Sequence, residues 1–285
     1  MATVERDLEG VFVVVTGANT GIGRATAVAL AGRGASLVLA CRSEEKARPV
    51  LDEIGALRAG SAEVVVLDLS SLESVRAAAA RILGLARPID RLVNNAGMAG
   101  RRGLTRDGFE LAFGTNHLGH FLLTMLLFPA LRRADRARIV NVSSQAHYDV
   151  AGIDFDAVRK RTKSITGVHE YGVSKLANVL FTKELARRLG PGGVHSYALH
   201  PGVVASDAWR RVPWPIRTLM KRRMLSTEDG AKTSLYCATS ERVANDTGLY
   251  YDTCAVKTPS VTAQDPALAK RLWERSVEWV GADLP

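Results

Sequence analysis

The chain has 285 residues, of which 47% are hydrophobic, and this is enough for one large α/β domain with a sizeable core. No apolar run approaches a membrane span and the N-terminus has no apolar signal region, so we expect a cytoplasmic protein without a transmembrane segment. The formal net charge is +9, but six basic residues and no acidic one lie between positions 208 and 223, so the charge is local and does not favour a nucleic-acid partner.

The first predicted strand, Val11–Val15, runs into a glycine-rich loop and then into a helical pattern at Ala25–Ala31. A strand that turns through glycines into a helix start points free N–H groups and the positive end of the helix dipole at one place. The missing Cβ atoms let a pyrophosphate approach closely. We therefore predict dinucleotide binding by the loop residues Gly17, Asn19, Thr20, Gly21, Ile22 and Gly23, with a purely structural tight turn as the alternative.

Apolar runs and helical patterns then alternate to the end of the chain. Further strands are predicted at Ser36–Cys41, Glu63–Asp68, Ile89–Asn94, Arg138–Ser143, Val194–Leu199 and Gly248–Asp252. Helices are predicted at Glu44–Leu57, Ser71–Ala86, Phe113–Leu131 and Val173–Leu189. This order predicts a single domain over residues 1–285, a doubly wound Rossmann-type α/β fold with a seven-stranded, mainly parallel sheet and helices on both faces.

Two long intervals interrupt the alternation, at about residues 145–170 and 205–225. Both follow strand ends on the carboxyl side of the sheet, where ligands bind in open α/β folds, so we expect them to be lids or pocket walls. The second carries Trp209 and Trp214 beside the basic residues. It could cover a bulky apolar substrate, rest on an anionic membrane, or simply pack its tryptophans onto the core.

The residue at the end of the second strand bears on the choice of nicotinamide cofactor. An NAD site places an acidic residue there to bind the ribose 2′-hydroxyl, whereas this strand ends at Arg42. A guanidinium matches a 2′-phosphate and gains little from a hydroxyl, so NADP(H) is favoured over NAD(H). The alternative is that Arg42 is a solvated residue at a helix start.

Tyr171 and Lys175 are four residues apart and so share one face of the predicted helix. A free phenol has a pKa near ~10 and is a poor base at neutral pH. A nearby ammonium group favours the phenolate and lowers that pKa, which would suit Tyr171 to acid–base catalysis. Taken alone, the spacing is more typical of an ordinary surface pair on a helix than of a catalytic pair.

These motifs together resemble the short-chain dehydrogenase/reductase family. The resemblance rests on Thr16-Gly-x-x-x-Gly-Ile-Gly, Asn94-Asn-Ala-Gly97 and Tyr171-x-x-x-Lys175, and it covers roughly residues 10–279. Ala40-Cys-Arg and Asn116-His-Leu-Gly-His-Phe are similar to the retinol-dehydrogenase-like subgroup. Animal members of that subgroup often carry an N-terminal membrane anchor, which we do not expect in this protein, so retinol itself is not inferred.

The resemblance implies the remaining site residues. Ser144, with Ser143 as the fallback, would polarise a substrate carbonyl, and Asn116 would complete a proton relay with Lys175. Further cofactor contacts are implied for Asp68, Leu69, Asn95, Ala96, Gly97, Pro201, Gly202 and Val203, besides Tyr171 and Lys175. The family often has Thr three residues after the Gly202 position, where this chain has Ala205 and then Ser206.

No metal site is predicted. His117 and His120 have a metal-like spacing but no carboxylate or thiol beside them, and the three cysteines, Cys41, Cys237 and Cys254, are scattered. The cysteines are expected to be reduced core residues.

The sequence therefore predicts an NADP(H)-dependent oxidoreductase that interconverts a carbonyl compound and an alcohol on a bulky, largely apolar substrate. The alternative is a catalytically idle NADP(H)-binding redox sensor. The resemblance also implies a homodimer or homotetramer paired through the helices at Phe113–Leu131 and Val173–Leu189.

Overall fold

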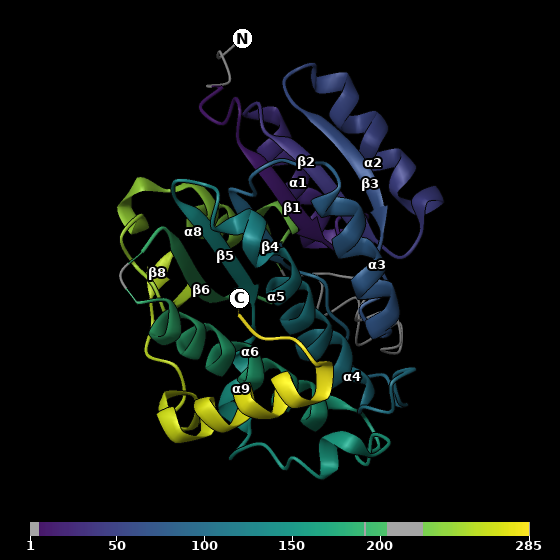
Figure 1. Ribbon diagram of the computed structural model, residues 1–285, viewed down its shortest axis with the longest axis vertical. Coiled ribbons are helices and arrows are strands. Elements are labelled where there is room, and N and C mark those ends of the chain that lie inside the picture. Colours follow the sequence, from purple (N-terminus) through teal and green to yellow (C-terminus); the bar gives the residue numbers. More distant parts are fainter. Residues whose placement is uncertain (1–5, 191, 204–224, 285) are drawn as a thin grey trace.

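The computed structural model describes residues 6–190, 192–203 and 225–284 (Figure 1). Segment 204–224, with both predicted pocket-wall tryptophans, the basic cluster and Ser206, lies outside the described residues. The expectation that it covers the substrate therefore stays a prediction.

One sheet runs through the described chain, with strand order β3-β2-β1-β4-β5-β6-β7-β8. The strands are β1 (Phe12–Thr16), β2 (Ser36–Cys41), β3 (Ser61–Val66), β4 (Arg91–Asn94), β5 (Ala137–Val142), β6 (Val194–His200), β7 (Leu249–Asp252) and β8 (Ala255–Val256). All neighbours pair in parallel except β7 and β8. The predicted count of seven strands was wrong because it omitted β8. This strand has only two residues and is too short to give a periodic pattern.

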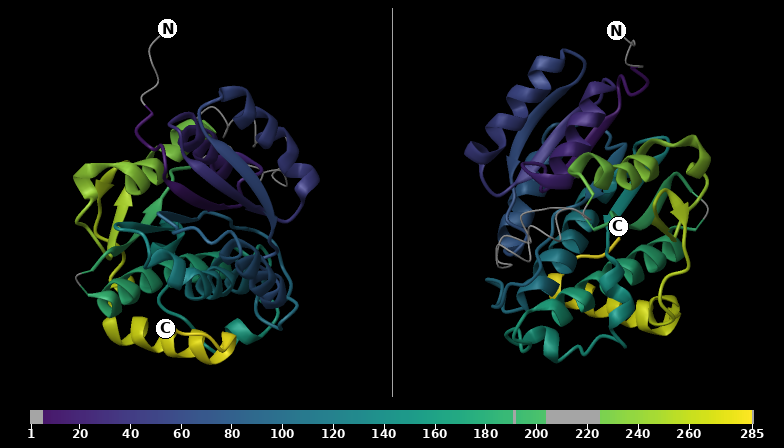
Figure 2. Two further views of the ribbon diagram at one scale, coloured as in Figure 1. Left: turned by 45° about the horizontal axis from the view of Figure 1, so that its top comes forward. Right: turned by 180° about the vertical axis from the view of Figure 1, so that it is seen from behind.

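Helices cover both faces of the sheet, as predicted. The first layer consists of α1 (Gly21–Gly32), α2 (Glu44–Leu57) and α8 (Thr227–Thr239), seen in front in Figure 2, right. The second consists of α3 (Leu72–Leu83), α5 (Gly119–Leu131) and α6 (Val168–Leu189), with α9 (Pro266–Val280) packed outside α6 (Figure 1). Each helix layer packs on the sheet through its own hydrophobic core, and alternate strand residues point into one core or the other. Val13 and Val15 face the first layer, and Val14 faces the second.

The ends of several helices follow from local chemistry. Ser43 accepts a hydrogen bond from the Lys46 amide and so begins α2, with Glu44 and Glu45 in its first turn. Asp265 accepts from the Ala267 and Leu268 amides and so begins α9, whose first residue is Pro266. The described part of the chain also contains short helical turns: α4 (Leu111–Phe113), η1 (Gly114–Leu118), η2 (Gln145–Asp149), η3 (Ala157–Arg159), η5 (Glu241–Val243) and η6 (Thr262–Gln264).

The long helix predicted from Phe113 begins earlier and is interrupted. It runs through α4, one π-helical turn at Gly114–Leu118, and α5. The stretch Leu111–Leu131 is long and apolar enough to cross a membrane, which was not predicted from the sequence, and an 18-residue window within it has a mean hydropathy of 1.3. However, 83% of that window is buried inside the protein, which is typical of the core helix of a soluble fold.

The outer surfaces of the two long helices are covered by α9. Trp273 of α9 packs its ring 5.1 Å from that of Phe121 on α5 and 5.9 Å from that of Phe181 on α6. Ser276 of α9 hydrogen-bonds to His117 at 3.0 Å. A partner subunit could reach these aromatic residues only if α9 moved, so this face is filled within the chain.

Candidate active site

The glycine-rich loop leaves β1 at the point where the strand order reverses, between β2 and β4. Gly17 and Gly21 have φ values of +66° and +57°, which favour glycine. A Cβ atom on Gly23 would lie 2.3 Å from the Gly17 carbonyl oxygen and 2.4 Å from Asn95 Nδ2. The first helix therefore packs too closely on the loop and on the end of β4 for any larger residue at position 23.

Side chains from two strand ends hold this loop in place. Thr16 Oγ1 accepts hydrogen bonds from the Asn95 and Ala96 amides, at 3.0 and 2.9 Å, and lies 2.8 Å from His120 Nε2. Asn95 Nδ2 donates to the Thr16 carbonyl at 2.8 Å. The predicted residues Asn95 and Ala96 are thus brought against the loop, with His120 as a support that the sequence did not reveal.

The start of α1 fits an anionic ligand. The side chain of its N-cap residue, Thr20, makes no capping hydrogen bond, and no acidic residue lies in the first turn. The first amides of the helix and its positive dipole end are therefore uncompensated by side chains at the loop formed by Gly17, Asn19, Gly21 and Ile22. A pyrophosphate group would supply the missing acceptors.

Arg42 is exposed directly after β2, and in the described part of the chain it has no hydrogen-bond or ion-pair partner. Arg24, in contrast, forms a bidentate pair with Glu53 at 2.6 and 2.9 Å. Of the two arginines, it is therefore Arg42 whose guanidinium is available to bind a ligand phosphate.

Asp68 lies two residues beyond β3, which ends earlier than predicted. Its carboxylate accepts hydrogen bonds from the amide and hydroxyl of Ser70. The next residue, Leu69, is buried, and its carbonyl oxygen is so close to Gly119 that a Cβ there would lie 2.5 Å away. Both predicted residues, Asp68 and Leu69, thus lie at the carboxyl edge of the sheet, in the loop between β3 and α3.

Ser144 follows the end of β5, and Tyr171 lies in the first turn of α6; the fold brings the two side chains together. The helix begins at Val168, five residues earlier than predicted, so Tyr171 and Lys175 both lie in its first two turns. Ser144 accepts from the Ala146 amide at 3.2 Å and hydrogen-bonds to the Tyr171 hydroxyl. Ser143 instead donates to the Lys175 carbonyl at 2.7 Å and is buried. The structure thus places Ser144, not Ser143, beside the phenol.

The electrostatics of the pair differ from the sequence-based expectation. Burial raises the pKa of Tyr171, and the hydrogen bond from Ser144 only partly opposes this. Lys175 Nζ lies 5.6 Å from the Tyr171 ring centre and donates to the Val142 carbonyl at 2.8 Å. Burial also lowers the pKa of Lys175 to about 7, so the ammonium is only partly populated at neutral pH. The phenol therefore keeps its proton.

Asn116 sits in the π-helical turn, and Gly97 lies between it and Lys175. A Cβ on Gly97 would lie 3.5 Å from Asn116 Oδ1 and 3.4 Å from Lys175 Nζ. Asn116 Oδ1 accepts from the Met98 amide, and Nδ2 donates to the Met98 carbonyl and to Ser174. The side chain thus fixes the segment after β4 against the catalytic helix, while the predicted water relay stays a prediction.

Pro201, Gly202 and Val203 follow β6 at the same edge. Gly202 has a φ of +84°, and the Val203 carbonyl accepts from the Leu225 amide at 2.9 Å.

His117 and His120 are buried structural residues. Burial lowers the pKa of His117 to about 3 and that of His120 to about 4. Among the described residues no group of His, Cys, Asp or Glu could hold a metal ion. All three cysteines are free, and Cys41 and Cys237 are buried.

These two histidines should make the protein sensitive to acid. An unfolded histidine titrates near ~6.5, so between about pH 6.5 and 4 the unfolded chain binds more protons than the folded one. The free energy of unfolding should fall with decreasing pH in this window, by up to about 1.4 kcal/mol per pH unit for each histidine. Urea unfolding between pH 7 and 5 measures this. His117→Gln should reduce the slope, and the exposed control His169→Gln should not; equal slopes in all three proteins would contradict the assignment.

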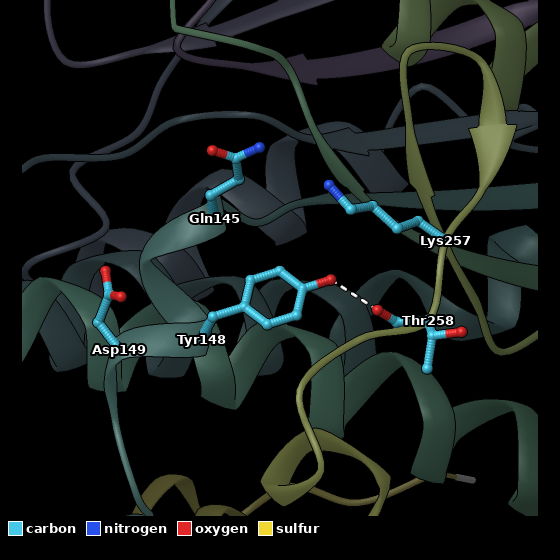
Figure 3. Close-up of a pocket in the computed structure, with 5 residues that line it drawn as sticks. All are labelled: Gln145, Tyr148, Asp149, Lys257 and Thr258. Carbon is cyan, nitrogen blue, oxygen red and sulfur yellow. Dashed lines mark hydrogen bonds between the residues drawn. The ribbon is translucent and has the colours of Figure 1, made fainter.

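A cavity of about 600 Å³ opens at η2, the short helix that Ser144 caps (Figure 3). Its lining consists of Gln145, Tyr148, Asp149, Lys257 and Thr258. The first three come from η2, within the predicted pocket-wall interval 145–170, and the other two follow β8. The contribution of residues 257–260 could not be predicted from the sequence, because no local motif marks them and only the tertiary fold brings them to η2.

Comparisons with known proteins were made for the whole chain. A family model described as short chain dehydrogenase matches residues 11–214. Retinol dehydrogenase 13 of Homo sapiens is 43% identical over 292 residues, covering 98% of this chain and 87% of that protein.

Solved structures agree with the fold. An uncharacterized protein from Mycobacterium paratuberculosis superposes with a TM-score of 0.79 at 34% identity, covering 98% of this chain and 97% of that one. A 3-oxoacyl-[acyl-carrier protein] reductase from Brucella melitensis with bound NAD gives 0.69 at 25% identity, covering 87% and 91%. A structure described as an NAD(P)-dependent gluconate 5-dehydrogenase from Beutenbergia cavernae, with NADP at low occupancy, gives 0.71 at 28% identity, covering 87% and 96%.

Proposed function

The chain belongs to the short-chain dehydrogenase family and is a carbonyl/alcohol oxidoreductase of that family, and we propose that it uses NADP(H), with Tyr171 as the acid–base residue. The observation that carries the proposal is the contact between Ser144 and Tyr171. This contact lies near the buried Lys175, at the same edge of the sheet as the glycine-rich loop. A nicotinamide cofactor, when bound there, supplies or accepts the hydride.

The residues of the chain then perform the proton chemistry. In carbonyl reduction Ser144 donates a hydrogen bond to the substrate oxygen, and Tyr171 delivers its proton to the same atom. The raised pKa of Tyr171 keeps the phenol protonated for this step. Lys175, one helical turn further on, stabilises the phenolate that remains and is itself close to titrating at neutral pH. A protonated phenol is the state that the carbonyl-reduction step requires.

The preference for NADP(H) rests on Arg42, since the solved relatives include both NAD-bound and NADP-bound proteins. Arg42→Asp replaces a charge-assisted contact to the 2′-phosphate by repulsion. We expect the ratio of kcat/KM with NADPH to that with NADH to fall by at least about tenfold.

The matched control is Arg48→Asp, the same charge reversal at an exposed position of α2. It should leave the ratio within about twofold, since a solvated charge contributes little. Equal use of NADPH and NADH by the unsubstituted protein would contradict the role of Arg42.

We also propose a bulky, largely apolar carbonyl substrate. The support for this is the similarity to a relative named as a retinol dehydrogenase. The described residues of the cavity wall are mostly polar and do not add to it. Kinetics over a series of aldehydes of increasing apolar size tests this. Highest kcat/KM for the smallest or most polar aldehydes would contradict it.

A further inference from the structure

The structure assigns a role to His147, a buried residue of η2 that no motif singles out. We propose that His147 is a positioning residue: its imidazole holds the Ser144 peptide on one side and the segment 257–260 on the other, and so sets the geometry of the pocket. The kinetic part of this inference rests on the proposed function.

Two hydrogen bonds define the state of the His147 ring. The Ser260 backbone amide, which can only donate, lies 3.1 Å from Nε2, so Nε2 must accept. In a neutral imidazole the proton is then on Nδ1, which donates to the Ser144 carbonyl at 2.7 Å. One ring thus joins the residue beside the reacting oxygen to a segment 113 positions away in the sequence.

The surroundings of His147 favour this single state. The side chain is fully buried, and its ring packs 4.0 Å from that of Tyr148 and 4.9 Å from that of Tyr250. Burial is the main cause that lowers the pKa of His147, so the ring is neutral at physiological pH, as the bond to Ser260 requires. A neutral ring that is packed between two tyrosine rings and has both nitrogen atoms bonded is well suited to hold two backbone segments at a fixed distance.

Residues of η2 and residues 257 and 258 form opposite walls of the cavity (Figure 3). Tyr148 donates to the Thr258 carbonyl at 2.6 Å across this gap. Lys257 pairs with Asp252 at 2.7 Å, and Asp252 also accepts from Gln145. Of these ties, His147 alone also reaches the Ser144 backbone. It therefore couples the position of the wall to that of the serine.

The two bonds can be removed one at a time. His147→Asn places an amide near the Nδ1 position, so it keeps a donor for Ser144 but cannot reach Ser260. His147→Gln keeps an acceptor near the Nε2 position for Ser260 but loses the donor to Ser144. We expect the Asn variant to raise KM and the Gln variant to lower kcat, each on the order of five- to tenfold, with the other constant changed by less than about threefold.

Controls separate positioning from general destabilisation. His195→Asn removes a partly buried ring that bonds a backbone carbonyl at the opposite end of β6, and it should change neither constant. Ser260→Pro removes the amide N–H that donates to His147 Nε2, so it should reproduce the raised KM of the Asn variant. Ser260→Ala keeps that N–H and should leave KM unchanged. If the His147 variants fail to fold, the Ser260 pair still tests the bond at Nε2.

The tautomer itself is a readout that does not depend on activity. Nitrogen NMR of the imidazole should show His147 neutral with its proton on Nδ1. A proton on Nε2, or a rise in KM and a fall in kcat of the same size in both the Asn and the Gln variant, would overturn the role of His147. Absence of reductase activity in the unsubstituted protein would instead overturn the proposed function.

Discussion

Replacing Tyr171 with phenylalanine is expected to lower kcat by about 10²–10⁴-fold, the usual contribution of a positioned proton donor. The substitution removes only the hydroxyl that contacts Ser144, so the ring and its packing beside Lys175 remain. NADPH binding, measured by fluorescence or calorimetry, should persist.

Tyr250→Phe is the matched control. Its hydroxyl is buried without a hydrogen-bond partner in the described structure, so its loss should leave turnover unchanged and the protein at least as stable. A Tyr171→Phe protein that kept most of its activity would show that another group delivers the proton.

Replacing Lys175 with methionine should lower turnover at least about 10²-fold and yet stabilise the fold. The lysine is buried, and burial lowers its pKa to about 7 from the 10.5 of a free side chain. Between about pH 7 and 10 the unfolded chain therefore binds more protons than the folded one, and stability rises with pH. At neutral pH the burial of the amine lowers the free energy of unfolding by on the order of a few kcal/mol. A methionine of similar length has no ionisable group and would not carry this cost.

Chemical denaturation at pH 7 and 9 measures this effect. The unsubstituted protein should become more stable with rising pH, and Lys175→Met should show a smaller rise and a higher value at pH 7. Lys183→Met, on the same helix and only partly buried, is the control that should retain turnover. A Lys175→Met protein less stable than the parent at both pH values would mean that the bond to Val142 outweighs the cost of burial.

Features with a local chemical cause could be predicted from the sequence. Helix α2 has the predicted bounds, because Ser43 caps it and its apolar residues recur with helical period. The glycine-rich loop likewise connects the predicted strand and helix, since glycine adopts the positive φ values at positions 17 and 21 without strain.

Features that depend on tertiary contacts could not be predicted. The covering of Phe121 and Phe181 by Trp273 joins helices far apart in the chain, and no periodicity in either reveals it. The π-helical turn around Asn116 has no pattern of its own. The raised pKa of Tyr171 reverses the direction expected from its spacing to Lys175, because spacing carries no information about burial.

The central claim is that this chain transfers hydride between NADP(H) and a carbonyl compound with Tyr171 as the proton donor. The most direct test mixes the purified protein with NADPH and a large apolar aldehyde and follows the loss of reduced-nicotinamide absorbance, with Tyr171→Phe measured in parallel. We predict steady oxidation of NADPH that matches alcohol formation and is nearly abolished by the substitution. Tight NADPH binding without oxidation across small and large aldehydes and ketones would contradict the claim and favour a redox sensor.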